Sequence, residues 1–317
     1  MSRVKNECLR KGKLFVPIIF SFGAGLENLP LKEFLEDPTK ISNSLRTIHN
    51  YFRVDGVVCA DKTILPEALG CHVDWSKSPP LIQPSSAKID ELGTCATNLF
   101  EKGRVKTAVE VTRRLSILLP EAFLMGLVTG PLTLAGQLTG LSEAEIFGHR
   151  DLLSITSNAI LTYSKGLCDA GIDLLLFSER ELPGLDEQSL KQLRRCYSPI
   201  WNTVRFYEAF PLLMVENFSP EDVNLISKVV DDLILPGGYV PDNLQKFKRL
   251  SFALPVSLLE NEPEDIESFL VKSSIVAALN SSTLFLLTTD SEVPGSIHKE
   301  FLIRGVQSIR DFLKKGP

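Results

Sequence analysis

The sequence predicts an α/β fold of the (β/α)8 TIM-barrel type, built as a single domain over residues 1–317. Eight short, almost continuously apolar runs alternate with longer amphipathic segments, a pattern typical of parallel strands buried on both faces. Several of the amphipathic segments open with residues that cap helices. The length also suits one large barrel, since such barrels run to about 250 residues and more. A doubly wound sheet has the same alternation, but the count of eight strands favours the barrel.

Each apolar run is rich in β-branched or aromatic residues, as strands are. In chain order, the predicted strands cover residues 16–22, 54–60, 122–129, 172–178, 211–217, 232–236, 251–259 and 282–289. The stretch 122–140 has no charged residue over 19 positions, but its glycines and Pro131 favour a strand followed by a loop over a membrane span.

Helix signals lie between these strands. Asp37 precedes Pro38 at a first helical position, and Ser142 with Glu145 forms a capping box. Further helix starts are expected at Ser219-Pro220, Pro241, Pro263 and Ser296, and Gly171 is expected to end a long helix over about 143–170. Residues 61–121 form an extended connection between the second and third strands, with helical stretches at 86–101 and 105–118. We interpret this connection as a lid or rim of the barrel.

Composition limits the classes of partner. The net charge is −5 and the sequence pI is about 5.6, so there is no basic excess to neutralise phosphates and nucleic acid is not an expected partner. The six cysteines are scattered, with no C-x-x-C pair, in a chain large enough to fold without disulfides. We therefore expect a reduced, cytoplasmic protein that does not enter a membrane.

Most candidate site residues follow the predicted strands, because barrel active sites form at the carboxyl ends of the strands. These ends supply six carboxylates and one arginine among the residues Asp61, Glu179, Arg180, Glu216, Asn217, Glu260, Asn261, Asp290 and Glu292. An acidic mouth accepts hydrogen-bond donors or cations, or raises the pKa of a carboxylate for acid–base work. The alternative is capping of the next helix, which we expect for Asp37, Asp186 and Glu262. Function is favoured at Asp61 and left open at Glu179 and Glu216.

The loop after the third strand adds Gly130, Thr133 and Gln137 to the candidate binding residues. It lacks both the P-loop and the dinucleotide-binding glycine patterns. None of the four histidines lies at ligand spacing from a cysteine except in the adjacent pair Cys71-His72, and there is no G-x-S-x-G elbow. Neither a zinc site nor a serine hydrolase is predicted.

Four motifs in order resemble the uroporphyrinogen decarboxylase superfamily. They are VDGVVCADKTILPEALG at 54–70, TGPLTLAGQLTG at 129–140, DAGIDLLLFSE at 169–179 and TTDSEVPGSIHKEFLIRGVQSIRDF at 288–312. The resemblance covers most of the chain and implies a (β/α)8 barrel. It also implies one of two activities, cofactor-free decarboxylation of a tetrapyrrole or methyl transfer from a methylated corrinoid. Asp61 matches the aspartate that faces the pyrrole N–H groups in the decarboxylases.

The details of the motifs favour the methyltransferase branch. The arginine-bearing M-R-Q-A-G-R-Y segment of the decarboxylases is replaced here by SFGAGLE at 21–27, and their G-H-G turn by TTDS at 288–291. A substrate with eight carboxylates needs arginines, and an acidic mouth would repel it. In contrast, EALGCHVD at 67–74 and the loop at 130–140 read more like the corrinoid-dependent methyltransferases.

The chain also departs from that branch at its zinc site. The methyltransferases that act on coenzyme M bind zinc through an H-x-C pair at the fifth strand and a cysteine near the last strand. Here the fifth strand reads MVEN at 214–217, and Ser291 stands where the cysteine would be. An acceptor that needs no thiolate would resolve this, and the N–H groups of tetrahydrofolate or another amine-type acceptor suit an acidic mouth.

The resulting expectation is a zinc-free, corrinoid-dependent methyltransferase of one-carbon metabolism. Its methyl donor is a methylcobamide on a small corrinoid-binding partner protein, and its acceptor is tetrahydrofolate. Asp61 and Glu216 are the expected catalytic residues, and the expected substrate-binding residues are Glu179, Arg180, Asn217, Asp290, Gly130, Thr133 and Gln137. Two alternatives stay open, a tetrapyrrole decarboxylase and a non-catalytic barrel that binds a corrinoid or tetrapyrrole. Convergence of Lys62, Arg180 or Arg249 on the pocket would favour the decarboxylase.

Overall fold

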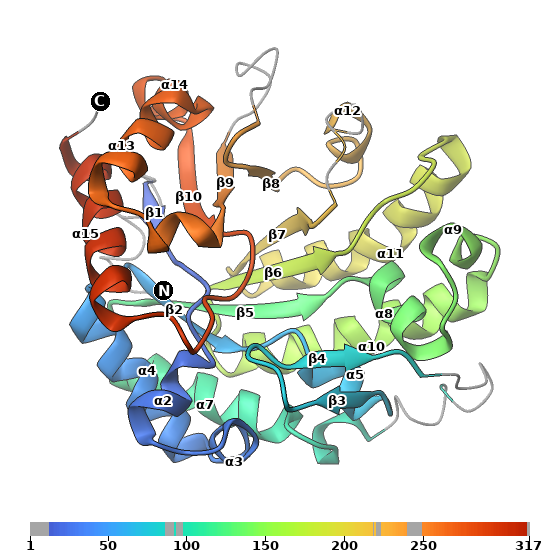
Figure 1. Ribbon diagram of the computed structural model, residues 1–317. Helices are drawn as coiled ribbons and strands as arrows, with labels where there is room; N and C mark the ends of the chain where they lie inside the picture. Colours follow the sequence, from blue (N-terminus) through green and yellow to red (C-terminus); the bar gives the residue numbers. More distant parts are fainter. Residues whose placement is uncertain are drawn as a thin grey trace.

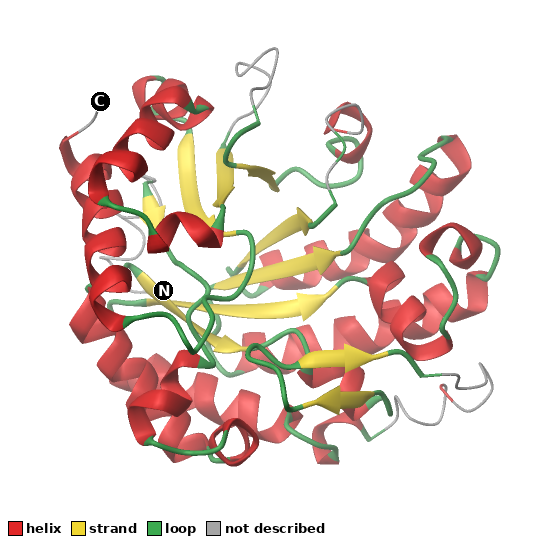
Figure 2. Ribbon diagram, in the orientation of Figure 1, coloured by secondary structure: helices red, strands yellow, loops and turns green. Residues whose placement is uncertain are grey.

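The computed structural model describes residues 13–85, 92, 98–217, 219, 223–239 and 249–315. Its centre is an eight-stranded sheet in the order β1-β10-β9-β8-β7-β6-β5-β2, and each neighbouring pair is parallel. The sheet curls into a nearly closed barrel with helices around it, and a separate two-stranded sheet lies beside one end (Figures 1 and 2). The predicted (β/α)8 barrel is confirmed.

Seven of the eight predicted strands are present with shifted ends, and the first strand lies just before its predicted range. The eight strands are β1 (Leu14–Phe15), β2 (Gly56–Ala60), β5 (Phe123–Thr129), β6 (Leu174–Glu179), β7 (Phe210–Val215), β8 (Leu233–Pro236), β9 (Leu250–Leu254) and β10 (Leu284–Thr289). The largest error concerns the first strand, which was expected over 16–22. Pro17 has no N–H to give to the sheet, so β1 ends before it. In the same way, Pro255 ends β9 well before residue 259.

Asp55 joins the two ends of the sheet. The Asp55 N–H donates to the Phe15 carbonyl at 3.1 Å, and the Asp55 carboxylate accepts from the Phe15 N–H at 2.8 Å. Burial raises the pKa of Asp55, while the bond from Phe15 lowers it in part. These two bonds link the start of β2 to β1 where the sheet pairing is interrupted.

Most predicted helix signals appear as expected. Asp37 accepts from the N–H groups of Thr39 and Lys40, and the Ser142–Glu145 capping box is complete. The main helices are α4 (Pro38–Phe52), α7 (Val105–Leu118), α8 (Pro131–Thr139), α10 (Arg150–Asp169), α11 (Glu187–Phe206), α13 (Pro263–Lys272), α14 (Ser274–Asn280) and α15 (Lys299–Lys315). Shorter helices are α2 (Phe22–Glu27), α3 (Leu31–Glu36), α5 (Ile64–Ala68), α9 (Glu143–Ile146) and α12 (Val223–Ile226), with 3-10 turns at Leu99–Glu101 and Val256–Glu260. The signals at Pro220 and Pro241 lie outside the described residues.

The expected single helix over 143–170 is wrong. Helix α9 ends at Ile146, and α10 begins only at Arg150. Gly148 and His149 turn the chain by donating to the carbonyls of Glu145 and Ile146 in place of continued helical bonds. Gly171, with φ of +96°, follows α10 as predicted, because a left-handed residue costs glycine little.

The long connection 61–121 contains an element that the sequence reading missed. Strands β3 (His72–Asp74) and β4 (Leu81–Gln83) form an antiparallel hairpin beside the barrel mouth (Figure 1). The helix predicted at 105–118 is α7, whereas most of the stretch 86–101 lies outside the described residues. The role of this connection as a lid or rim stays a prediction.

Two general expectations can be compared with the structure. The described part of the chain has no helix with the length and apolar character needed to cross a membrane. Of the six cysteines, Cys59, Cys71, Cys168 and Cys196 are described, and all four are buried free thiols.

Candidate functional site at the barrel mouth

Two pockets open at the carboxyl ends of the strands. The first, which we call the hairpin pocket, has a volume of about 180 Å³ and lies between β4, α8 and the ends of β5 and β6. The second, the β8 pocket, has a volume of about 340 Å³ and is bordered by the ends of β7, β8, β9 and β10. Lys62 and Glu216 line both pockets. The site predicted at the strand ends is therefore a divided mouth with these two side chains in the middle.

Lys62 and Glu216 form an ion pair across the mouth. The Lys62 Nζ contacts Glu216 Oε1, and the Ser178 hydroxyl donates to the same oxygen at 2.9 Å. The Thr129 hydroxyl donates to the Lys62 carbonyl at 2.7 Å and fixes the backbone below this lysine. The two side chains keep 48% and 35% of their surface exposed, so water screens the pair and a ligand can displace it.

Asp61 lies in a buried network beside this pair. Its Oδ2 accepts from Arg104 at 2.7 Å, and its Oδ1 accepts from the N–H and the hydroxyl of Thr63. Arg104 also donates to Glu67 at 2.7 Å and to Thr63 at 2.6 Å, and it packs 4.8 Å from the Trp75 ring centre. Burial opposes the charge on Arg104, but Asp61 and Glu67 outweigh it, so the pKa of the guanidinium is raised.

This network changes the expected position of Asp61. Both of its oxygens are bonded within the protein, and its side chain is only 4% exposed. Asp61 is not one of the described residues that line the two pockets. Asp61 therefore fixes the start of the loop that carries Lys62, and its predicted catalytic role stays a prediction.

Glu179 holds the loop after β5. Its carboxylate is fully buried and accepts from the N–H groups of Leu132 and Thr133 at 3.2 and 2.8 Å and from the Tyr197 hydroxyl at 2.7 Å. Burial raises the pKa of Glu179, and these three bonds lower it in part. Gly130 makes the close approach possible, since a Cβ at this position would lie 2.3 Å from the Glu179 carboxyl carbon. Glu179 and Gly130 therefore hold the loop after β5, and their predicted part in substrate binding stays a prediction.

Three other predicted binding residues line the hairpin pocket, namely Arg180, Thr133 and Gln137. The Arg180 guanidinium pairs with the buried Glu143, and the Thr133 hydroxyl accepts from the Arg180 N–H at 2.7 Å. The Gln137 side-chain oxygen is buried and has no hydrogen-bond partner. Because a buried acceptor without a partner is costly, this oxygen is a position for a ligand N–H or O–H group.

Two further carboxylates from the strand-end list lie near β10. Asp290 lines the β8 pocket and accepts from the Val256 N–H at 3.1 Å and the Ser291 hydroxyl at 2.8 Å. Glu292 is half-buried and accepts from the Ser21 N–H. Burial raises the pKa of Glu292 to about 7, and the nearby Asp61 raises it further, while Lys62 opposes the shift. A carboxyl with this pKa exchanges its proton near neutral pH, as acid–base chemistry requires.

The sequence reading missed several members of this site and misjudged one cap. Asn217 is exposed and donates its N–H to the Arg180 carbonyl, but it is not among the residues that line the two pockets. Arg104 and Ser178 were not predicted, because Arg104 lies far from any strand end and Ser178 is an uncharged residue inside the predicted strand 172–178. Asp186 caps α11 as expected, whereas the Glu262 side chain pairs with Arg304 instead of capping α13.

The described residues offer little to a resident metal ion. Within the described ranges, no group of three or more His, Cys, Asp or Glu side chains is arranged to hold a metal. Glu216 and Ser291 line the β8 pocket, and the described residues that line it include no histidine and no cysteine. These residues do not fit a zinc site that activates a thiol.

Residues 18–193 match the sequence profile of the family described as uroporphyrinogen decarboxylase (URO-D). The chain belongs to the URO-D family. The matched region covers more than half of the chain and includes Asp61, Lys62, Arg104 and the loop after β5. A search of curated proteins found no match to this URO-D chain.

Solved structures with the same fold include a methyltransferase from Methanosarcina mazei. It aligns with a TM-score of 0.73 and 16% identity, and the alignment covers 98% of each chain. A B12-independent methionine synthase from a Shewanella species, in complex with selenomethionine, aligns with a TM-score of 0.55 and 11% identity over 90% of this chain and 89% of that one. At these identities the likeness establishes the fold of this URO-D family member.

Proposed function

We propose that this protein is a methyltransferase that moves a methyl group from a methylated corrinoid to tetrahydrofolate or another amine-type acceptor, without zinc. The observation that carries the proposal is the meeting of two mouth pockets at Glu216, on a URO-D barrel whose β8 pocket, in the described part of the chain, is lined by no histidine or cysteine. The fold shared with a Methanosarcina methyltransferase supports the same class of reaction. The corrinoid is delivered by a small partner protein that covers the mouth.

The acceptor is recognised through its N–H groups. Glu216, the unpartnered Gln137 oxygen and Asp290 are hydrogen-bond acceptors on the pocket walls. A pterin ring presents several N–H donors on one edge and needs acceptors spaced around it. Binding of such a ring to Glu216 competes with Lys62, whose exposed ion pair with that carboxylate costs little to break.

The transfer requires the protein to manage one proton. The acceptor nitrogen attacks the methyl carbon, a carbon–nitrogen bond forms, and the carbon–cobalt bond breaks with both electrons remaining on the corrinoid. The proton of the acceptor N–H must then leave. Glu216 is the carboxylate that reaches both pockets, and Glu292, with its pKa near 7, is a further proton carrier at the same end of the barrel. Asp61 positions the loop of Lys62 in this scheme.

A methyl-transfer assay tests the proposal. Purified protein is mixed with methylcobalamin, and loss of the methyl-corrinoid absorbance is followed with tetrahydrofolate or with a thiol as acceptor. We expect loss with tetrahydrofolate and a decrease of at least tenfold in its rate for Glu216→Gln. Glu260→Gln is the matched control, because Glu260 is also an exposed carboxylate, at the end of the 3-10 turn after β9, but lies on neither pocket. Transfer to the thiol alone would contradict the proposal.

A second candidate is a tetrapyrrole decarboxylase, which a specific observation favours. Lys62 and Arg180 both line the hairpin pocket, as a substrate rich in carboxylates would need. Each already has an acidic partner, however, and Arg249 pairs with Asp232 and stacks on Phe210, away from the mouth residues. Release of carbon dioxide from uroporphyrinogen by the pure protein, without methyl transfer, would establish this alternative. Binding of methylcobalamin without either reaction would indicate a non-catalytic barrel.

A further inference from the structure

A groove of about 240 Å³ lies on the outside of the barrel, between helices α10 and α11. Helix α10 contributes Arg150, Ser157 and Leu161, and helix α11 contributes Gln192, Arg195 and Pro199. Within each helix, consecutive members of this set are three, four or seven positions apart, so they form one stripe that faces the other helix. The groove shares no lining residue with the hairpin pocket or the β8 pocket.

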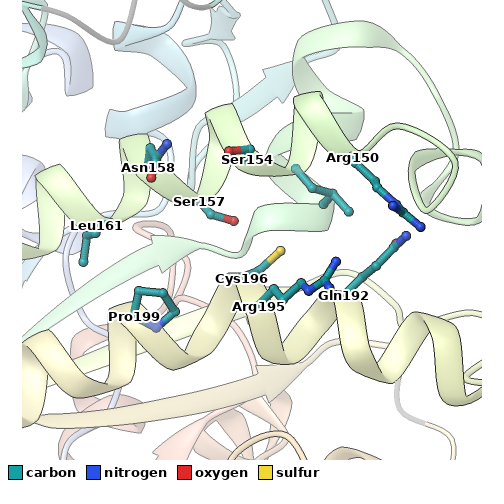
Figure 3. Close-up of a pocket in the computed structure, with 10 residues that line it drawn as sticks. Arg150, Ser154, Ser157, Asn158, Leu161, Gln192, Arg195, Cys196 and Pro199 are labelled. Carbon is teal, nitrogen blue, oxygen red and sulfur yellow. The ribbon is translucent and has the colours of Figure 1, made fainter.

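One end of the groove is cationic. Figure 3 shows the Arg150 and Gln192 side chains pointing toward one another at this end, with Arg195 beside them. Neither arginine takes part in any of the ion pairs formed among the described residues. Guanidinium groups stay charged at all physiological pH values and bind carboxylates through paired N–H donors. This end therefore attracts an anion.

Gln192 adds a second and independent indication of a ligand. Its side chain is only 6% exposed, and its carbonyl oxygen has no hydrogen-bond partner. An anion placed between the arginines cannot satisfy this oxygen, because both are acceptors. The ligand must therefore carry an N–H or O–H donor close to its negative charge.

The rest of the groove selects the body of the ligand. Leu161 and Pro199 lie together at the end opposite the arginines, and Ser157 and Cys196 lie between the two ends (Figure 3). Burial raises the pKa of the Cys196 thiol, so this group stays neutral at physiological pH and does not repel an anion. An apolar group of a few carbon atoms fits beside Leu161 and Pro199.

We propose that this groove binds a 2-hydroxycarboxylate with an apolar side chain. The carboxylate contacts Arg150 and Arg195, the 2-hydroxyl donates to the Gln192 oxygen, and the side chain lies against Leu161 and Pro199. A 2-amino acid is disfavoured, because its ammonium group would face the two guanidinium groups. The site is separate from the mouth and does not depend on the function proposed there.

Calorimetric titration of the full chain with mandelate tests this site. Mandelate carries a carboxylate, a 2-hydroxyl and a phenyl group, and two matched probes each lack one feature, phenylacetate the hydroxyl and mandelamide the charge. We expect saturable binding of mandelate at one site per chain and at least fivefold weaker binding of both matched probes. Equal affinity for the three compounds, or no saturation by mandelate, would overturn the proposal.

Variants locate the binding. Arg195→Gln and Gln192→Leu are each expected to weaken mandelate binding at least fivefold. Arg46→Gln, which removes the same charge from an exposed position on α4, is expected to leave it unchanged. Thermal unfolding of each variant confirms that it is folded. If Lys62→Gln lowers the affinity and Arg195→Gln does not, mandelate binds in the mouth and the groove proposal is wrong.

Discussion

Replacement of Arg104 by methionine is the sharpest test of how the mouth is built. Arg104 is 3% exposed and donates to Asp61, Glu67 and Thr63 from three different nitrogen atoms. Methionine fills a similar length of side chain without charge or donors. The variant therefore leaves the Asp61 carboxylate buried with no cation beside it.

The size of the effect follows from this burial. Removing one partner of a buried ion pair costs about 3–5 kcal/mol, because the remaining charge stays out of water without compensation. We expect Arg104→Met to lower the free energy of unfolding by that amount. Asp61→Asn in the same chain removes the uncompensated charge, so the double variant should recover about half of the loss.

Urea unfolding followed by circular dichroism measures these differences. Arg113→Met is the matched control, since Arg113 pairs with Glu110 at 3.0 Å on the surface, with side-chain exposures of 55% and 35%. Such exposed pairs contribute only about 0–1 kcal/mol. Two results would refute the reasoning, a loss below about 1 kcal/mol for Arg104→Met or a double variant as unstable as Arg104→Met alone.

Two further predictions concern the same end of the barrel. Gly130→Ala should lower stability by about 1–3 kcal/mol, because the new methyl group would lie 2.3 Å from the Glu179 carboxyl carbon. Gly25→Ala is the control, because no atom lies within 4 Å of the added carbon, and it should be neutral or slightly stabilising. If urea unfolding shows equal losses of stability for Gly130→Ala and Gly25→Ala, the role assigned to Gly130 is wrong. The pKa of Glu292 is about 7 in the folded protein and 4.5 in the unfolded chain. Between these pH values the folded protein therefore binds more protons than the unfolded chain. The stability contributed by Glu292 must then fall as the pH rises from about 4.5 to 7. Glu292→Gln should remove up to roughly 3 kcal/mol of this fall. The prediction is wrong if the free energy of unfolding changes by the same amount between pH 5 and pH 7 in both proteins.

The fold was largely predictable because its signals are local. A buried parallel strand needs a run of apolar residues, and seven of the eight predicted runs contain a strand, whereas β1 lies just before the first run. The errors occurred where a single residue changed the outcome, such as Pro17, which ends β1, and the turn at Gly148 that separates α9 from α10. The β3–β4 hairpin was missed because its strands have only three residues each and alternate weakly.

The site was less predictable, because its charges are matched by residues far away in the sequence. Asp61 and Arg104 are 43 positions apart, and Lys62 and Glu216 are 154 apart. The list of strand-end residues shows six carboxylates but only one cation, Arg180, because Lys62 lies on the loop after β2 and Arg104 lies just before α7. The prediction of an acidic mouth therefore counted the carboxylates but left out the cations that neutralise them. Glu216 and Asp290, selected from the strand ends, and Thr133 and Gln137, selected from the loop after the third strand, line the pockets.

This charge balance determines what the mouth can bind. Asp61 is neutralised by Arg104, Glu216 by Lys62, and Glu179 is buried among N–H and O–H donors. Of these three carboxylates, Glu216 alone lines the pockets, and its partner is half exposed. A ligand with N–H donors can take the place of Lys62 on Glu216, whereas an anionic ligand can take the place of Glu216 on Lys62. Variants of this ion pair therefore distinguish the two candidate reactions. Loss of Glu216 abolishes turnover if the protein transfers methyl groups, and loss of Lys62 abolishes it if the protein is a decarboxylase. The residue that turnover requires is the one that the substrate contacts.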